Sequence, residues 1–162
     1  MVPTATTVLV VEDELGGAMA WAERRAVPLT WKPKLLEIRA TFTQPESHEL
    51  FYLRGRVDDY KVLPPTWTFT DQSWLADPAP AFFPKLAQSP YGASMFITYR
   101  GPVICAPFNR LAYAEHQGPH ADWSGPSSWL TAGAPDQVRA HFLGDMLQLI
   151  FRDFVHSRGR MG

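Results

Sequence analysis

Hydrophobic and polar residues alternate along residues 34–43 and again along residues 48–57. In the first segment Ile38, Ala40 and Phe42 fall on one side of an extended chain, and charged or hydroxyl side chains fall on the other. This two-residue period is typical of a strand with one buried face. A short polar turn that contains a proline separates the two segments, so the pattern predicts an antiparallel hairpin.

Two further apolar segments extend the predicted sheet. Residues 66–70 and 95–99 are rich in aromatic and β-branched side chains, a composition that strands favour. We expect them to add a third and a fourth strand to the hairpin. The result would be a four-stranded antiparallel meander.

Helical spacing marks both ends of the chain. Apolar residues recur every three or four positions across residues 136–155, which predicts an amphipathic helix, and Pro135 suits its first turn. A second helix is expected over at least residues 12–26, because residues 18–26 are rich in helix formers, although a pair of glycines weakens the middle of a continuous helix here. Pro28 lies beyond it as a stop signal.

Length and composition fit one α+β domain. A helix, a meander, a long loop and a second helix form an α+β order. A chain of 162 residues with 46% hydrophobic and 19% charged residues is typical of a globular protein. Such a chain buries about two thirds of its unfolded surface. We therefore expect residues 1–162 to form a single domain.

Charge and cysteine content exclude several classes of partner. The net charge of −1 creates no general attraction for nucleic acid, and no basic stripe with interleaved aromatic residues is present. The apolar residues 8–11 are too few to span a membrane, and acidic residues follow them at once. The single cysteine allows no intramolecular disulfide, which favours a reducing compartment. We expect a cytoplasmic protein with no nucleic-acid or membrane partner.

Cys105 is the main candidate for chemistry. It lies between Pro102 and Pro107, in a stretch where nine of the 15 prolines fall between residues 78 and 135. Prolines interrupt regular structure, so Cys105 is expected on a loop, where functional residues concentrate. The competing interpretation is a small core residue, because free cysteine is often buried.

The order of features around Cys105 resembles that of ubiquitin-conjugating enzymes. A tyrosine enters a loop, a double proline and an aromatic strand follow, a glycine and an isoleucine precede the cysteine, and a tryptophan precedes the last helix. In this chain they are Tyr60, Pro64, Pro65, Phe69, Gly101, Ile104, Cys105 and Trp129. The similarity covers roughly residues 35–155.

This resemblance implies a fold, a reaction and a set of partners. The fold has an N-terminal helix, a four-stranded antiparallel meander, a long active-site loop with the cysteine, and a C-terminal helix. Cys105 would accept a ubiquitin-like protein as a thioester from an activating enzyme, which consumes the ATP, and would pass it to an amine of a protein target. No metal or organic cofactor is implied. The activating enzyme is expected to dock on the first helix and nearby strands.

The chain also departs from the common pattern of that family. The histidine-proline-asparagine tripeptide that precedes the cysteine in the family is absent, and Tyr91, Gly92, Ala93 and Ser94 occupy about that region. The pattern is closer to divergent bacterial relatives from ubiquitin-like conjugation operons, which often serve antiphage defence. Those relatives imply a further partner, a deconjugating metallopeptidase.

Three nearby residues are candidates to replace the missing asparagine. Asn109 lies four positions after Cys105 and carries an amide that could donate a hydrogen bond to an oxyanion. His116 and His120 lie in the loop that should return toward the cysteine, and either could orient the site or accept a proton. Both histidines could equally be exposed loop residues.

His120 is the preferred histidine, because Pro119 and Trp123 beside it indicate an ordered setting. Asp122 could hold an incoming lysine, although an exposed aspartate with no catalytic role is the simpler interpretation. The candidate catalytic set is therefore Cys105, His120, Asn109, His116 and Asp122.

Other functions stay open on the residues alone. The missing tripeptide is also compatible with a non-catalytic binding module of the same fold, which would recognise ubiquitin-like or partner proteins. Cys105 with a loop histidine is compatible with a thiol hydrolase. Cys105, His116 and His120 could bind zinc, but three ligands in a loop rich in glycine and proline make a weak zinc pattern.

Overall fold

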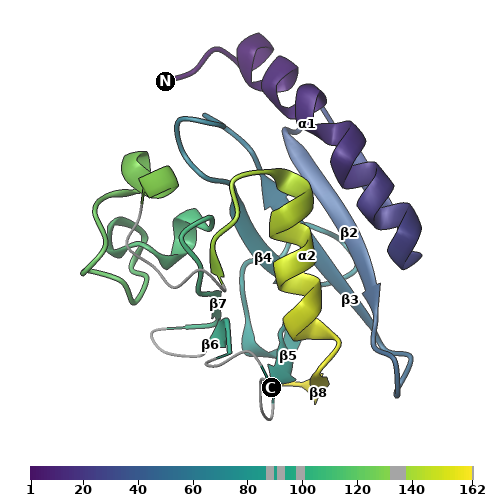
Figure 1. Cartoon of the computed structure of the whole chain (residues 1–162). Helices are drawn as coiled ribbons and strands as arrows, with labels where there is room; N and C mark the ends of the chain where they lie inside the picture. The colour runs from purple at the N-terminus through teal and green to yellow at the C-terminus, as the bar shows by residue number, and fades with distance from the viewer. Residues whose placement is uncertain (87–89, 91–93, 98–100, 132–137, 162) are drawn as a thin grey trace.

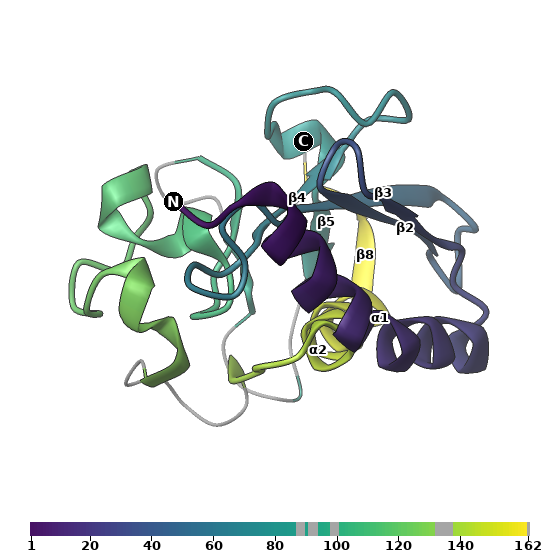
Figure 2. The ribbon, with the colours of Figure 1, turned by 90° about the horizontal axis from the view of Figure 1, so that it is seen from above.

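The computed structural model describes residues 1–86, 90, 94–97, 101–131 and 138–161. The architecture is α+β, with an N-terminal helix, a four-stranded antiparallel sheet and a C-terminal helix (Figure 1). Figure 2 shows both helices on the same side of the sheet. The helices are α1 (Thr4–Arg25) and α2 (Leu143–Phe154), and the strands of the sheet are β1 (Leu29–Lys32), β2 (Glu37–Thr43), β3 (Leu50–Arg56) and β4 (Thr66–Thr70).

Two short strand pairs and several single turns of 3-10 helix complete the described chain. The pairs are β5 (Pro84–Leu86) with β8 (Ser157–Arg160) and β6 (Phe96–Ile97) with β7 (Val103–Ile104). The turns are η1 (Pro80–Phe82), η2 (Arg110–Ala112), η3 (Ala114–His116) and η4 (Pro126–Thr131). In Figure 1 the segment from β7 to η4 lies beside the sheet, as the green part of the ribbon.

The predicted hairpin is confirmed. Strands β2 and β3 pair in antiparallel register, with Ala40 opposite Leu53. Ile38, Ala40 and Phe42 are fully buried, as their alternation indicates. On this face Phe42 packs against Phe154 of α2, with ring centroids 5.0 Å apart. Aromatic contacts between β2 and α2 therefore fix the C-terminal helix on the sheet.

The predicted fourth strand is wrong. Phe96 and Ile97 do not join the meander but pair with Ile104 and Val103 in a separate hairpin. The fourth position belongs to β1, which pairs with β2 through a turn in which Leu36 adopts a left-handed conformation with φ 51°. Composition favours the wrong segment, because Phe96 and Ile97 are apolar whereas β1 alternates apolar residues with Thr30 and Lys32.

The predicted N-terminal helix is confirmed, whereas the C-terminal helix begins later than predicted. Helix α1 spans Thr4–Arg25, which covers the predicted minimum to within one residue and extends it toward the N-terminus, where Thr7 and Val11 are buried. Helix α2 begins at Leu143, later than residue 136, because Phe142 has extended backbone angles of φ −122° and ψ 149°. Pro135 lies outside the described residues.

No helix in the described part of the chain is both long and apolar enough to cross a membrane. Helix α1, the longest of the described helices, carries exposed charged residues such as Glu12 and Asp13. Its inner side carries Trp21, whose ring packs edge-on against Phe151 of α2 at 5.6 Å. The two helices therefore form one amphipathic layer.

Candidate active site

Cys105 follows strand β7 at the end of the β6–β7 hairpin. Its backbone N–H donates to the carbonyl oxygen of Met95 at 2.7 Å, which extends the pairing of the hairpin by one bond. Its side chain is half-buried, whereas the preceding Ile104 is fully buried. The thiol therefore lies at the rim of the core and not inside it.

A buried carboxylate links this hairpin to helix α2. Asp153 is only 1% exposed, and its Oδ2 accepts the N–H of Met95 at 3.0 Å. Burial raises the pKa of this carboxyl group, and the Met95 hydrogen bond opposes the rise. Since Met95 also holds the Cys105 backbone, helix α2 reaches the cysteine through two consecutive hydrogen bonds.

Asn109 is a structural residue in this fold. Its fully buried amide donates to the carbonyl of Trp67 at 3.0 Å and to that of Ile104 at 2.8 Å. Its Oδ1 accepts the N–H of Trp67 at 2.9 Å. Both amide hydrogens are engaged, so this side chain has none left for an oxyanion. It connects β4 to the segment that carries Cys105.

Arg110 connects the double-proline loop to the segment that carries Cys105. The sequence pattern did not predict this role. Its Nε donates to the carbonyl of Pro64 at 3.1 Å, and its backbone N–H donates to that of Pro65 at 2.9 Å. Its Nη1 pairs with Asp58 at 2.9 Å. Such a buried arginine, only 7% exposed, satisfies several carbonyl groups with one planar side chain.

The loop after η2 returns to the cysteine. His120 donates its backbone N–H to Ala112 at 3.1 Å, and Gly118 donates to Tyr113 at 2.9 Å. The hydroxyl of Tyr113 donates to the carbonyl of Pro107 at 2.8 Å. These bonds close the loop on itself and place His120 beside Cys105.

Cys105, His120 and Asp122 form a connected series. The Cys105 Sγ lies 2.7 Å from His120 Nε2, and His120 Nδ1 lies 3.1 Å from Asp122 Oδ1. When Nδ1–H donates to the carboxylate, Nε2 is left as the acceptor for the thiol proton. The imidazole stacks on Trp123 with centroids 3.6 Å apart and ring planes 2° from parallel. Its orientation is thus fixed on three sides.

The charges of this series favour a protonated thiol at rest. Burial, and secondarily the charge of Asp122, raises the pKa of Cys105 to about 11. The hydrogen bond from His120 lowers the pKa of Asp122, whose side chain is 75% exposed. The site therefore pairs a neutral thiol with an adjacent proton acceptor, and the thiolate forms only when a reaction draws the proton away.

His116 lies apart from this series. It ends η3, and its side chain is exposed. It lines a separate hollow together with Pro102 and Leu111. Within the described ranges, no three histidine, cysteine or acidic side chains are grouped so that they could hold a metal ion.

The tyrosine and tryptophan of the resemblance are packing residues. Tyr60 is fully buried, and its hydroxyl donates to Glu14 at 2.8 Å. Trp129 packs against Tyr60 with ring centroids 6.3 Å apart, and its Nε1 donates to the carbonyl of Lys61 at 3.2 Å. Glu14 also accepts the N–H of Leu143 at 2.9 Å, at the start of α2. The loop before the double proline is therefore joined to both helices.

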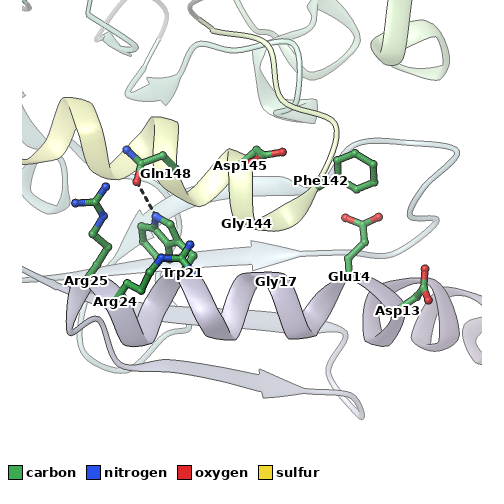
Figure 3. A pocket seen from close by; sticks show the side chains of 10 residues that line it. All are labelled: Asp13, Glu14, Gly17, Trp21, Arg24, Arg25, Phe142, Gly144, Asp145 and Gln148. Carbon is green, nitrogen blue, oxygen red and sulfur yellow. Dashed lines mark hydrogen bonds between the residues drawn. The ribbon is translucent and has the colours of Figure 1, made fainter.

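A second hollow lies between helices α1 and α2, away from the cysteine (Figure 3). Its volume is ≈ 550 Å³. Arg24 and Arg25 lie at one end, Asp13 and Glu14 lie at the other, and Trp21 lies between them, with its Nε1 donating to Gln148 at 2.7 Å. This hollow has opposite charges at its two ends.

The segment that precedes the cysteine in the resemblance is only partly visible. Tyr91, Gly92 and Ala93 lie outside the described residues, while Ser94 donates from its hydroxyl to the carbonyl of Phe96 at 3.4 Å.

Comparisons of the chain with protein-family models, curated proteins and solved structures found no match. The function of this chain must therefore be inferred from its own residues.

Proposed function

We propose that this chain carries a ubiquitin-like protein as a thioester on Cys105 and transfers it to an amine of a protein target. The observation that carries the proposal is the contact of 2.7 Å between Cys105 Sγ and His120 Nε2, at a half-buried rim and not in the core. A cysteine used only for packing has no need of an oriented imidazole. This geometry supports nucleophilic catalysis with an adjacent base.

The first step is thioester exchange. Cys105 Sγ attacks the C-terminal glycine carbonyl of the modifier, which is held as a thioester on the activating enzyme, while His120 Nε2 accepts the thiol proton. The carbonyl–sulfur bond to the activating enzyme breaks, and the departing thiolate takes up a proton. Because the pKa of Cys105 is raised to about 11, this proton transfer has to accompany the attack.

The second step is aminolysis. A neutral lysine amine attacks the Cys105 thioester, the amide bond forms, and the Cys105 thiolate leaves. His120 accepts the proton from the attacking nitrogen and returns one to the sulfur. The exposed carboxylate of Asp122 lies next to this point and can pair with the lysine ammonium before it loses its proton.

The site's other proposed partners follow from the resemblance. The activating enzyme would dock on α1, where the hollow between α1 and α2 offers Trp21 with arginines at one end and acidic groups at the other. A deconjugating metallopeptidase and a role in bacterial antiphage defence belong to the same proposal.

A thiol hydrolase is the second candidate, because the series Cys105, His120 and Asp122 also suits attack by water on an acyl-enzyme. The raised pKa of the Cys105 thiol argues against it, since many thiol hydrolases rest as a thiolate with a depressed pKa. A non-catalytic binding module of the same fold does not require a base beside the thiol, so it does not account for the contact between Cys105 and His120.

The test uses a synthetic peptide that ends in diglycine thioester, because its reaction does not require the activating enzyme. We expect intact-protein mass spectrometry to detect one acyl group on Cys105 within minutes, and none on Cys105→Ser. We expect His120→Ala to acylate about 100-fold more slowly while retaining the wild-type unfolding midpoint. Equal acylation of wild type and Cys105→Ser would sink the assignment, and an unreactive, folded wild type would favour the binding module.

A further inference from the structure

The outer face of the sheet, opposite the helices, holds a buried arginine that lacks an ion pair. Arg54 on β3 is only 5% exposed. Its Nη1 donates to the carbonyls of Trp74 at 2.7 Å and Ala76 at 3.4 Å, and its Nε has no hydrogen-bond partner. Within the described residues, no ion pair includes it. Buried charges are normally paired, so this position favours an anionic ligand.

The neighbouring carboxylates do not supply that anion. Glu37 is engaged by Arg39 at 2.9 Å and by Arg56 at 3.2 Å. Asp77 lines the same hollow as Arg54 and Arg56, but its side chain is exposed and, among the described residues, forms no ion pair with Arg54. Burial, followed by the like charge of Arg56, lowers the pKa of Arg54. The local balance is therefore positive.

A groove opens at this arginine. A hollow with a volume of ≈ 220 Å³ is lined by Arg54 and Arg56, by Thr66 and Thr68, and by one carboxylate, that of Asp77. The hollow that His116 lines, with a volume of ≈ 240 Å³, continues from it. The two share Pro78 and Leu111, and the second reaches Gly101, Pro102 and Val103. The groove thus leads from the arginines to strand β7, which precedes Cys105.

We propose that this groove binds an acidic peptide segment of a partner protein. A glutamate or aspartate carboxylate would lie against the guanidinium groups of Arg54 and Arg56, whose planar donors match a carboxylate. The following residues would extend over Pro78 and Leu111 toward β7. Two connected hollows with a proline and a leucine between them fit a chain better than an isolated ion. The site is distinct from the cysteine and does not depend on its chemistry.

The experiment measures binding alone and uses Cys105→Ser protein, so that no acyl transfer can contribute. A fluorescein-labelled hexapeptide with two adjacent glutamates is titrated by fluorescence anisotropy, against the same peptide with glutamines. Inorganic phosphate is titrated separately as a competitor. We expect saturable binding of the acidic peptide and at least tenfold weaker binding of its glutamine analogue, because the analogue lacks the carboxylates that form charge-assisted hydrogen bonds with the guanidinium groups.

Two arginines of the same face provide a matched pair of variants. Arg56→Gln removes a groove cation, and Arg39→Gln removes one that contacts the same Glu37 but does not line the groove. We expect about a tenfold loss of peptide affinity for Arg56→Gln and less than a twofold change for Arg39→Gln. The side chain of Arg56 is 47% exposed, whereas that of Arg39 is 16% exposed and pairs with the buried Glu37. The unfolding midpoint of each variant is therefore measured beside its peptide affinity, so that a loss of folding is recognised.

Three outcomes would overturn the proposal. One is the absence of peptide binding up to millimolar concentration, and another is an equal effect of Arg56→Gln and Arg39→Gln. The third is binding of phosphate without binding of the acidic peptide, which would identify a small-anion site. None of these outcomes bears on Cys105, so the proposed transfer reaction would stand or fall separately.

Discussion

The side-chain amide of Asn109 pairs with the backbone of Trp67 as a neighbouring strand would. Its Oδ1 accepts the Trp67 N–H at 2.9 Å, and its Nδ2 donates to the Trp67 carbonyl at 3.0 Å. Strand β4 is the edge of the sheet, so these groups would otherwise lack a partner. The same amide donates to Ile104. The segment that carries Cys105 is thus attached to the sheet edge by one asparagine.

Asn109→Ala is therefore expected to lower the free energy of unfolding by about 3 kcal/mol, because it leaves buried backbone groups of Trp67 and Ile104 unpaired. Urea denaturation followed by tryptophan fluorescence measures this loss. Asn109→Asp retains the acceptor but loses both donors, and we expect it to be destabilised as well. A stable Asn109→Ala protein with no acyl transfer would instead assign the amide to the chemistry.

Gly118 has no room for a side chain at the start of the turn that delivers His120. A Cβ atom there would lie 2.2 Å from the carbonyl carbon of Ala112 and 2.4 Å from its oxygen. Because backbone cannot move aside easily, Gly118→Ala should displace the loop and separate His120 from Cys105. We expect acyl transfer to fall about 100-fold, close to the His120→Ala rate.

Gly16→Ala is the control for that substitution, since nothing lies within 4 Å of a Cβ atom at Gly16. This change in the exposed part of α1 should raise stability slightly, by about 0.5–1 kcal/mol. Wild-type transfer by Gly118→Ala would mean that the position of His120 does not matter.

Asp122→Asn should make Cys105 react faster with iodoacetamide but slower in acyl transfer. The charge of Asp122 contributes to the raised pKa of the thiol, so its removal should lower that pKa and speed alkylation by iodoacetamide between pH 8 and 9. The same change removes the carboxylate that orients His120, so acyl transfer should slow about tenfold. If alkylation and acyl transfer both became faster, or both became slower, the proposed separate effects of Asp122 on the Cys105 pKa and on the orientation of His120 would be wrong.

The stability of the fold should decrease at alkaline pH. The pKa of Cys105 is raised from 9.0 to about 11, and that of Tyr113 from 10.0 to about 12. Between those values the unfolded chain releases protons that the folded chain retains. Stability is therefore fully present below pH 9 and is lost as the pH rises toward 11 and 12.

Thermal unfolding at intervals between pH 8 and pH 11 measures that dependence. We expect a falling midpoint for the wild type and a smaller slope for Cys105→Ser, which removes one of the contributing groups; Tyr60, whose pKa burial also raises, is retained in both proteins. An identical slope for the two proteins would indicate that the thiol is not perturbed by the fold.

The sequence predicted the elements whose pattern is local. The alternation of Ile38, Ala40 and Phe42 identified the buried face of β2 correctly, because a sheet with one covered face requires that period. Residues 66–70 were predicted with the bounds of β4. In both cases the information needed lies within a few neighbouring residues.

The elements that depend on distant partners were not predictable in this way. Strand β1 was not predicted, because it is only four residues long and lies between two prolines. Only its pairing with β2 in the structure identifies it as a strand. The contacts of Asn109 with Trp67 span 42 positions. The ion pair of the buried Arg110 with the exposed Asp58 spans 52 positions. No periodicity records such long-range hydrogen bonds.

The candidate site could be predicted only in part, because some of its residues are close in the sequence while its geometry depends on long-range hydrogen bonds. Cys105 and His120 lie 15 positions apart in one loop-rich segment, and the proline and tryptophan beside His120 indicated an ordered turn. His116 carries the same side chain and lies four positions earlier, yet it lines another hollow. Only the hydrogen bonds that close the loop decide which histidine reaches the cysteine.

The fate of the acyl group on Cys105 tests the central claim most directly. Wild-type protein is acylated with the diglycine peptide thioester, separated from excess reagent, and divided between buffer and buffer with 50 mM lysine at pH 7.5. Loss of the thioester and the mass of the released product are followed by mass spectrometry, with His120→Ala treated in parallel. We predict that the wild-type thioester persists in buffer and is consumed by lysine with formation of the amide, at a rate about 100-fold above that of His120→Ala. Rapid release of the free acid at the same rate with and without lysine would contradict the account and identify a thiol hydrolase.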